Sequence, residues 1–352
     1  MTPREAAIKR LQEDTCPLPA GEPFTVDFYR PEDGYGVARL VFSVYGDGYP
    51  IDTYYIPEQL SEENRAGRIR SVVARTDSGQ VVCHEAFYRS SSPNPDMYEM
   101  GLGLTLPAYR GSLAFARCTN LLLSLIENST IKAIYGEAVC NHTITQKMAG
   151  PVKFVETGLE VDLMPATAYA KEQASDGRVT CLLYFRIGQD QRRPLCLPDC
   201  YAEQLRFMME GIGIDRELIQ PSSELLCDVS ELVVEQFDGP GVCRCNINRP
   251  GKDLRERLAT LEQEICSKNY ALQQCFVPLG TADAAASVAV LRSVGFFLGG
   301  FLPAWFGEDG LLMQKLYVEP GFDSIKLHSE RAKTIMEMVR ADWKRSKTLG
   351  NN

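Results

Sequence analysis

Histidine is scarce in this sequence, and its cysteines are not spaced for a metal. Only three histidines occur among 352 residues, and none stands at zinc-finger spacing from a cysteine. No Cys-x-x-Cys pair occurs; the closest spacings are Cys243-x-Cys245 and Cys196-x-x-x-Cys200. We therefore expect no metal site, and we interpret the 12 cysteines as reduced, small core residues. That interpretation favours a reducing compartment.

The chain also lacks a hydrophobic run long enough to cross a membrane, and no signal peptide opens it. Its formal net charge of −9 argues against the basic face that nucleic acid or an anionic membrane requires. We expect a cytoplasmic protein that binds neither. A hydrophobic share of 45% and a charged share of 24% are those of an ordinary globular protein. The length predicts about two domains.

The stretch of residues 97–121 is the most informative part of the chain. Its first half alternates between apolar and other residues, which places Glu99, Gly101 and Gly103 on one face of a predicted strand. Pro107 ends that strand, because proline lacks the N–H that a sheet ladder needs. Apolar residues then recur at helical spacing. A strand that turns sharply into a helix aims backbone N–H groups and the positive end of the helix at one point, which suits a phosphate.

This corner resembles the pyrophosphate-binding motif of the GNAT superfamily of acyl-CoA-dependent N-acyltransferases, in which a strand ends in Pro-x-Tyr-Arg-Gly-x-Gly and continues into a helix. Arg110 and Gly111 match that pattern, whereas Leu113 replaces the next glycine and Phe115 a later small residue. The leucine bears on how closely the backbone can approach a diphosphate. The resemblance implies acetyl-CoA as co-substrate and no metal. It implies that the residues binding this co-substrate are Leu104, Leu106, Arg110, Gly111, Ser112, Leu113, Ala114 and Asn141.

The order of predicted elements across residues 24–187 is also the GNAT order: strand, two helices, three strands, helix, strand, helix, two strands. The resemblance implies an α/β (α+β) fold with a mixed, mostly antiparallel central sheet flanked by helices. Residues 1–22 are interpreted as an arm, and residues 189–198 as a linker.

One further piece of sequence is similar to GNAT modules that occur fused to anti-sigma-factor-like ATPase modules. It begins with Tyr-Gly-Glu-Ala-Val at residues 135–139 and ends with Phe-Val-Glu-Thr-Gly-Leu at residues 154–159. The chain departs from the family pattern at Lys153-Phe154, where Gly-Phe is usual. It also lacks the tyrosine that often precedes that pair and serves as general acid.

Residues 1–190 are thus predicted to form a GNAT acyltransferase domain, and residues 191–352 a second, smaller and partially GNAT-like domain. The second stretch has no Arg-Gly corner; Arg249-Pro250-Gly251-Lys252 stands in its place. We therefore expect the second domain to bind no cofactor. The long helix predicted over residues 329–347 either packs on one of the domains or mediates self-association as a homodimer.

Acyl transfer to an amine needs a group that accepts the proton of the amine. Glu99 is one candidate, because it shares a strand face with Gly101 and Gly103, where a pantetheine arm would lie against backbone. The alternatives are a carboxylate at the rim, and glycines that form a bulge or allow close packing of a helix. Glu137, in the next predicted strand, points into the fold or into the cleft. Histidine side chains titrate near neutrality, so His142 is a third candidate, with a capping role as the alternative.

Asn141 is interpreted as a helix N-cap, with a cofactor contact as the alternative. Cys140 is a weak nucleophile candidate, because only the neighbouring histidine could stabilise its thiolate. We expect the amine of a small molecule or peptide to attack acetyl-CoA directly. The alternative is a non-catalytic acyl-CoA-binding or regulatory module with the same fold, which Leu113, Lys153 and the missing tyrosine favour.

Overall fold

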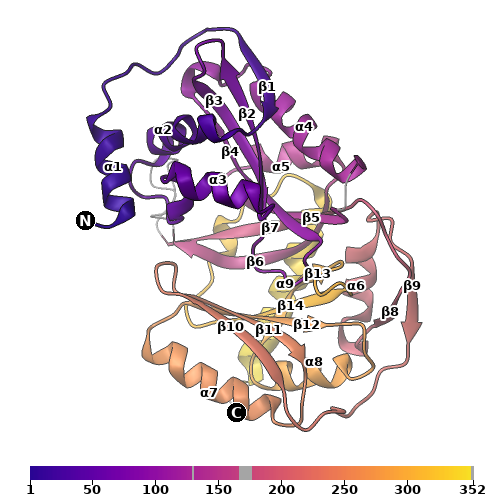
Figure 1. Ribbon diagram of the computed structural model, residues 1–352. Coiled ribbons are helices and arrows are strands. Elements are labelled where there is room, and N and C mark those ends of the chain that lie inside the picture. The colour runs from indigo at the N-terminus through magenta and orange to yellow at the C-terminus, as the bar shows by residue number, and fades with distance from the viewer. Residues whose placement is uncertain (129–130, 166–176, 350–352) are drawn as a thin grey trace. The chain divides into compact units, whose positions relative to one another are not determined.

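The computed structural model describes residues 1–128, 131–165 and 177–349, and the chain divides into two compact units (Figure 1). Unit 1 comprises Met1–Ser90 and Tyr98–Ile131, and unit 2 comprises Ser91–Met97 and Lys132–Asn352. These units are defined by contacts within the chain, whereas the predicted domains are defined by their resemblance to a fold. The predicted division after residue 190 therefore stays a prediction.

Unit 1 contains an antiparallel sheet with its strands paired in the order β1-β2-β3-β4. The strands are β1 (Phe24–Phe28), β2 (Ile69–Thr76), β3 (Val81–Tyr88) and β4 (Met97–Thr105). The helices are α1 (Pro3–Glu13), α2 (Gly34–Tyr45), α3 (Pro57–Arg65) and α4 (Ala114–Asn128). Figure 1 shows α2 and α3 on one side of these strands and α4 on the other. Their apolar stripes fill the space against the sheet, as amphipathic helices do.

Strand β4 contains a β-bulge. Leu102 and Gly103 together stand opposite the single residue Glu85 of β3. Leu102 adopts a φ of 52°, in the left-handed region that L-residues seldom occupy. Because a bulge inserts one residue, side chains beyond it point to the face opposite to the one that strict alternation predicts.

Because of the bulge, the Glu99 side chain and a Cβ on Gly103 point to opposite faces of β4. A Cβ added to Gly103 would lie 2.5 Å from the ring of Phe115 in α4, whereas one added to Gly101 would lie 2.7 Å from the hydroxyl of Tyr88. That hydroxyl donates to Glu99 at 2.5 Å. The prediction that Glu99 and Gly103 share a face is therefore wrong. For these glycines the structure shows the alternative to a cofactor channel, namely a bulge and close packing of side chains.

Unit 2 contains a longer sheet with the order β5-β7-β6-β13-β14-β12-β11-β10. Its strands are β5 (Ala133–Val139), β6 (Val155–Pro165), β7 (Arg178–Ile187), β10 (Glu231–Phe237), β11 (Val242–Arg249), β12 (Leu272–Pro278), β13 (Phe297–Leu302) and β14 (Gly310–Leu316). Its helices are α5 (Ile144–Ala149), α6 (Ala202–Met209), α7 (Leu254–Ser267), α8 (Ala284–Ser293) and α9 (Glu330–Leu349). The pair β11–β12 is parallel, with α7 as its crossover. The pairs β5–β7, β7–β6, β6–β13, β13–β14, β14–β12 and β11–β10 are antiparallel.

The sheet of unit 2 is joined at its middle by a close contact of two glycines. Gly158 of β6 pairs with Gly300 of β13, and a Cβ on Gly158 would lie 2.6 Å from the Cα of Gly300. The side-chain amide of Gln314 bridges to β6, donating to the carbonyl of Leu159 and accepting from the N–H of Val161, each at 2.9 Å. Only glycine fits at such a backbone approach.

The sheet of unit 2 curves so strongly that one face closes on itself. Glu137 of β5 lies 3.2 Å from Arg244 of β11, although five strands separate them in the sheet order. We call the face that carries these two residues the concave face. A cluster that includes Tyr135, Phe276 and Trp305 fills part of it, while α6 to α9 supply side chains to the core on the opposite face.

Three expectations are corrected by these elements. The predicted arm contains α1, whose Thr2 and Glu5 form a capping box. The predicted linker contains β8 (Arg193–Cys196), which pairs in parallel with β9 (Arg216–Ile219). Thr143, and not Asn141, takes the N-cap position of α5.

Helix α9 packs on β6 and β13 within unit 2, through a buried stripe that includes Ala332, Ile335 and Val339. This is one of the two alternatives predicted for it. Among the residues described, no helix has both the length and the apolar character needed to cross a membrane.

Candidate functional site

The corner between β4 and α4 is built by a short helix and a glycine. The 3-10 helix η3 (Pro107–Tyr109) closes with the N–H of Arg110 donating to the carbonyl of Pro107 at 3.2 Å. Gly111 then takes a φ of 89°, and α4 begins at Ala114. The glycine of the predicted motif is therefore needed for the turn itself.

This corner has backbone donors available for a ligand. The N–H of Ala114 donates to the hydroxyl of Ser112 at 3.2 Å. Among the residues that the structure describes, none accepts a hydrogen bond from the N–H of Gly111 or of Leu113. Arg110 beside them is exposed. These N–H groups, the guanidinium and the N-terminus of a 15-residue helix together suit a phosphate group.

Three of the predicted cofactor residues are buried instead. Leu104, Leu106 and Ala114 are at most 5% exposed, so their side chains belong to the core of unit 1. Leu106 also uses its N–H to pair with the carbonyl of Val82 at 2.9 Å. Leu113, at the position of the motif's second glycine, is 62% exposed, and its side chain stands mostly in solvent.

Glu99 lies in an aromatic environment. It is 9% exposed, and the hydroxyl of Tyr88 donates to its Oε1. Burial, together with neighbouring charges that include Glu99, raises the pKa of Tyr49 and of Tyr54. The predicted candidate base therefore adjoins the aromatic loop of residues 45–55.

That loop is held in place by α1. Arg4 donates to the carboxylate of Asp52 at 2.5 Å and to the carbonyl of Tyr49 at 2.7 Å. Its guanidinium also lies over the ring of Tyr55, 4.9 Å from the centroid. The first helix, interpreted from sequence as an arm, thus shapes the surface next to Glu99.

Two buried titratable side chains flank the bulge, and both are neutral near pH 7. Nδ1 of His84 donates to the carbonyl of Leu102 at 3.1 Å, and its Nε2 accepts from the hydroxyl of Ser71 at 3.1 Å. Burial lowers the pKa of His84 to about 4. On the opposite face, Thr119 donates to Glu85 at 2.7 Å, and burial raises the pKa of Glu85 to about 8. Both groups are held by hydrogen bonds within unit 1.

In unit 2, Glu137 points into the fold. It forms an ion pair with Arg244, and its side chain is 17% exposed. Neither Arg244 nor its second partner Glu160 stood out in the sequence, because strands distant in the chain bring them together.

Asn141 has an unsatisfied amide. Its Oδ1 and Nδ2 are both buried, and no described residue forms a hydrogen bond with either atom. Buried polar groups are nearly always paired, so this amide calls for a partner from outside the described residues. The interpretation of Asn141 as a ligand contact gains support, while its interpretation as an N-cap is wrong.

His142 is placed as a local cap. Its Nδ1 accepts the N–H of Ile144 at 3.4 Å, so the neutral ring carries its proton on Nε2. Gln146 fixes the surrounding loop by donating to the carbonyls of His142 and Lys326, at 3.1 and 2.9 Å. Burial raises the pKa of the Cys140 thiol to about 12, which argues further against a nucleophile there.

Lys153 keeps a backbone conformation that suits glycine. It adopts a φ of 62° and a ψ of 30° just after the 3-10 helix η4 (Gly150–Val152). Phe154 follows and packs on the core of unit 2. The position where GNAT members usually carry glycine therefore demands a left-handed residue here too, although it is a lysine.

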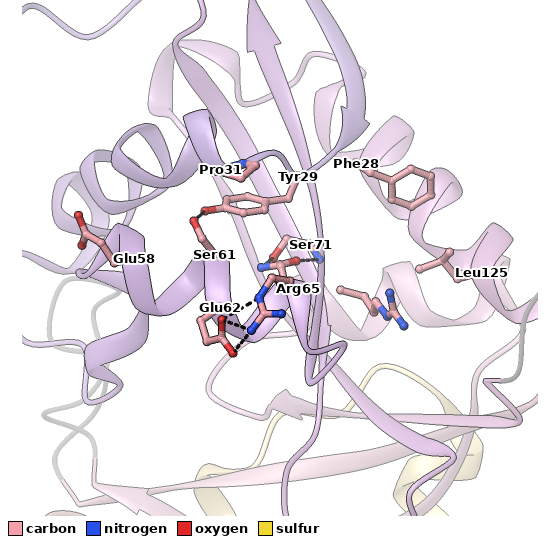
Figure 2. Close-up of a pocket in the computed structure, with 11 residues that line it drawn as sticks. Phe28, Tyr29, Pro31, Glu58, Ser61, Glu62, Arg65, Ser71 and Leu125 are labelled. Carbon is pink, nitrogen blue, oxygen red and sulfur yellow. Dashed lines mark hydrogen bonds and ion pairs between the residues drawn. The ribbon is translucent and has the colours of Figure 1, made fainter.

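A separate pocket of about 680 Å³ lies in unit 1, beside β1 and α3. Figure 2 shows Tyr29 pointing toward Ser61 across it, with Phe28 and Leu125 at the other side. No predicted site residue lines it. Across the described part of the chain, no group of three or more histidine, cysteine, aspartate or glutamate side chains could hold a metal ion.

The chain matches no family model and no curated protein. Solved structures to which it is similar include ribosomal-protein-S5-alanine acetyltransferase from Vibrio fischeri, at 11% identity, over 48% of this chain and 94% of that one, with a TM-score of 0.38. Another is an acetyltransferase of the GNAT family from Staphylococcus aureus Mu50, at 10% identity, over 47% and 100%, with a TM-score of 0.35. A third is yncA of Salmonella typhimurium with its cofactor acetyl-CoA, at 11% identity, over 48% and 96%, with a TM-score of 0.38.

The predicted fold class is confirmed. The described residues form mixed, mostly antiparallel sheets flanked by helices. Between residues 24 and 187, strands and longer helices follow in the predicted order: β1, α2, α3, β2, β3, β4, α4, β5, α5, β6 and β7.

Proposed function

We propose that this chain is an acyl-CoA-dependent N-acetyltransferase of GNAT type, which moves an acetyl group from acetyl-CoA to an amine of a small molecule or peptide. The observation that carries the proposal is the β4–α4 corner, where Gly111 and Leu113 present N–H groups beside the exposed Arg110. The diphosphate of CoA is the group that the family resemblance of this corner implies. The unsatisfied amide of Asn141 supports a ligand independently.

The proposed reaction is direct attack. The amine nitrogen bonds to the thioester carbonyl carbon, the C–S bond breaks, and the CoA thiolate leaves and takes up a proton. The amine must lose its own proton before or during attack, and a positioned base can accept it. We assign that role to Glu99, acting through water. The Tyr88 hydroxyl fixes the orientation of its carboxylate.

The other two candidates are less well placed. Nδ1 of His142 is engaged with the N–H of Ile144, and Glu137 is engaged with Arg244. A base must lie within reach of the proton that it removes, and these two side chains already form a local cap and an ion pair. His142 and Glu137 therefore rank behind Glu99.

Arg110→Glu tests the cofactor site. Calorimetry should show CoA binding weakened by about 1–3 kcal/mol, the range for losing a charge-assisted contact. Lys9→Glu, which makes the same charge change on an exposed face of α1, is the control for net charge. Unchanged affinity in a folded Arg110→Glu protein would remove this corner as the site.

A second candidate function is a non-catalytic acyl-CoA-binding or regulatory module. The observation that favours it is Leu113, which stands where the family motif has its second glycine. Thioester cleavage measured against a panel of amines separates the two functions. Binding of acetyl-CoA without transfer to any amine would select the module.

The twelve cysteines, eight of them buried, support the proposal of a reducing, cytoplasmic compartment.

A further inference from the structure

Arg244 of β11 is the centre of a polar cluster on the concave face of unit 2. Its Nη2 lies 3.2 Å from Oε1 of Glu137 and 3.1 Å from Oε1 of Glu160. Its Nε donates to the side-chain oxygen of Gln274 at 2.8 Å, and its Nη1 donates to the hydroxyl of Ser91. One guanidinium therefore joins β5, β6, β12 and the segment of residues 91–97.

The cluster holds two carboxyl groups but a single cation. Glu160 is 2% exposed, and an ionised carboxylate so buried is costly unless it is fully paired. Its Oε1 accepts from Arg244 and from Gln274, the latter at 2.7 Å. Its Oε2 is buried, and among the described residues it has no hydrogen-bond partner. If Oε2 carries a proton, it becomes a donor to the neighbouring carboxylate of Glu137, which would then be its hydrogen-bond partner.

We propose that Glu160 carries a proton that it shares with Glu137, and that Glu160 and Arg244 are positioning residues that hold Glu137 and residues 91–97. Burial, followed by the charge of Glu137, raises the pKa of Glu160 well above its usual range, while Arg244 and Gln274 act in the opposite direction. From β7, the Cys181 thiol faces the same groups, and burial raises its pKa as well, so it stays neutral.

The cluster continues along residues 91–97. The side-chain amide of Asn246 donates to the carbonyl of Ser91 at 3.1 Å. Ser92 donates to the carbonyl of Trp305 at 2.6 Å, and Asn94 donates to that of Ala304 at 2.7 Å. Residues of the C-terminal half of the chain thus hold residues 91–97 through hydrogen bonds. This segment runs into β4, and Glu99 lies two residues after it in the chain. Any effect of these hydrogen bonds on the reaction rests on the proposed function.

The shared proton can be tested without any activity. In full-length protein labelled with ¹³C at the glutamate carboxyl groups, NMR titration should show a glutamate that titrates well above the usual range of a carboxyl group, and Glu160→Gln should remove it. Glutamine keeps the shape and the hydrogen bonds of a protonated glutamate. Glu85→Gln identifies the signal of the other glutamate that titrates in this range. A titration unchanged by Glu160→Gln would overturn the proposal.

Arg244→Gln tests the role of the cation. Loss of the nearby positive charge should move the titration of the Glu160 signal upward by roughly one to three pH units. Arg249→Gln, on the same strand but paired with Glu231 at an exposed position, should move nothing. Equal behaviour of the two arginine variants would overturn the assignment of Arg244.

Activity supplies the second arm. If the cluster positions the reaction, acetyl transfer by the wild type should fall at the pH where the NMR titration shows Glu160 losing its proton. Glu160→Gln, scaled to its own maximum, should lack this fall. Transfer that falls identically in both proteins would overturn the positioning role. A wild type that binds acetyl-CoA but transfers to no amine would instead reject the proposed function and leave the NMR result standing.

Discussion

Two corners at which a strand leads into a long helix can be compared residue by residue: β4–α4 in unit 1 and β11–α7 in unit 2. At the first, Gly111 turns the chain with nothing within 4 Å of where its Cβ would be. At the second, Gly251 lies so close to residue Val229 that an added Cβ would be 2.4 Å from its carbonyl carbon. Ser230 donates to Asp253 from both its N–H and its hydroxyl, at 2.7 Å each, and accepts the N–H of Gly251 at 2.9 Å.

The difference shows that a glycine between a strand and a helix does not by itself make an anion site. What matters is which atoms occupy the donors at the start of the helix. In unit 2 the N–H groups of Gly251, Lys252 and Leu254 already donate within the chain, and the carboxylate of Asp253 lies beside them, which disfavours a phosphate at that position. The strands β11 and β12 beside this corner are also paired without a break from Val242 and Leu272 to Asn246 and Phe276.

We call β11–α7 the closed corner and β4–α4 the open corner. The largest expected effect comes from a substitution at the closed corner. Gly251→Ala should lower the unfolding free energy by about 3 kcal/mol, because the new methyl group overlaps backbone atoms. Gly111→Ala should cost only about 1 kcal/mol, from the left-handed backbone alone. Urea unfolding measures both. An equal loss in the two variants would contradict the contrast between the corners.

The strand that enters the open corner should carry the chemistry. Glu99→Gln should preserve folding and CoA binding but lower turnover by roughly 10²-fold or more, the range for losing a general base. His142→Ala is the matched variant for the competing assignment. If both keep full turnover and an unchanged pH–rate profile, neither residue is the base.

Only the open corner should bind CoA. Calorimetric titration should give one CoA per chain, and Arg110→Glu should weaken that binding throughout rather than for half of the sites. Asp253→Asn, which removes the carboxylate of the closed corner, should leave the stoichiometry at one. Two equivalent sites in the wild type would show that the closed corner opens.

The smallest expected effect concerns Lys153, a left-handed residue outside both corners. Lys153→Gly should raise the unfolding free energy by up to about 1 kcal/mol, because relief of the backbone conformation exceeds the entropy that glycine loses on folding. Thermal unfolding resolves such a change. A lower melting temperature would mean that the lysine side chain contributes contacts that outweigh the conformation.

Local patterns in the sequence predicted much of unit 1. The alternation before Pro107 and the helical spacing after it were enough to predict the β4–α4 corner. The capping box of Thr2 and Glu5 was equally local and could have revealed α1. A bulge was one interpretation of Gly101 and Gly103, but its place at Leu102 could not be predicted, because it depends on how β4 registers with β3.

The candidate site was predicted less completely, for a physical reason. Glu99 and Arg110 belong to one stretch of chain, and a motif could point to them. Arg244 and Glu160 are brought together by the curvature of a sheet, and Glu137 and Arg244 are 107 positions apart along the chain. No spacing in the sequence encodes such a contact. Asn141 was predicted as a cap, with a cofactor contact as the alternative, and its unsatisfied amide became visible only in the structure.

The paired glycines Gly158 and Gly300 bear on how unit 2 unfolds. Since the described residues of β6 and β13 pair at that one position, the hydrogen-bond ladders on either side can break independently. Proteins open in such contiguous cooperative blocks, each with its own free energy. We expect native-state hydrogen exchange to show β5, β7 and β6 as one block and β10 to β14 as another, coupled through the amide of Gln314. A single exchange free energy across both sets would show that this amide, together with the packing of α9, makes the sheet one cooperative body.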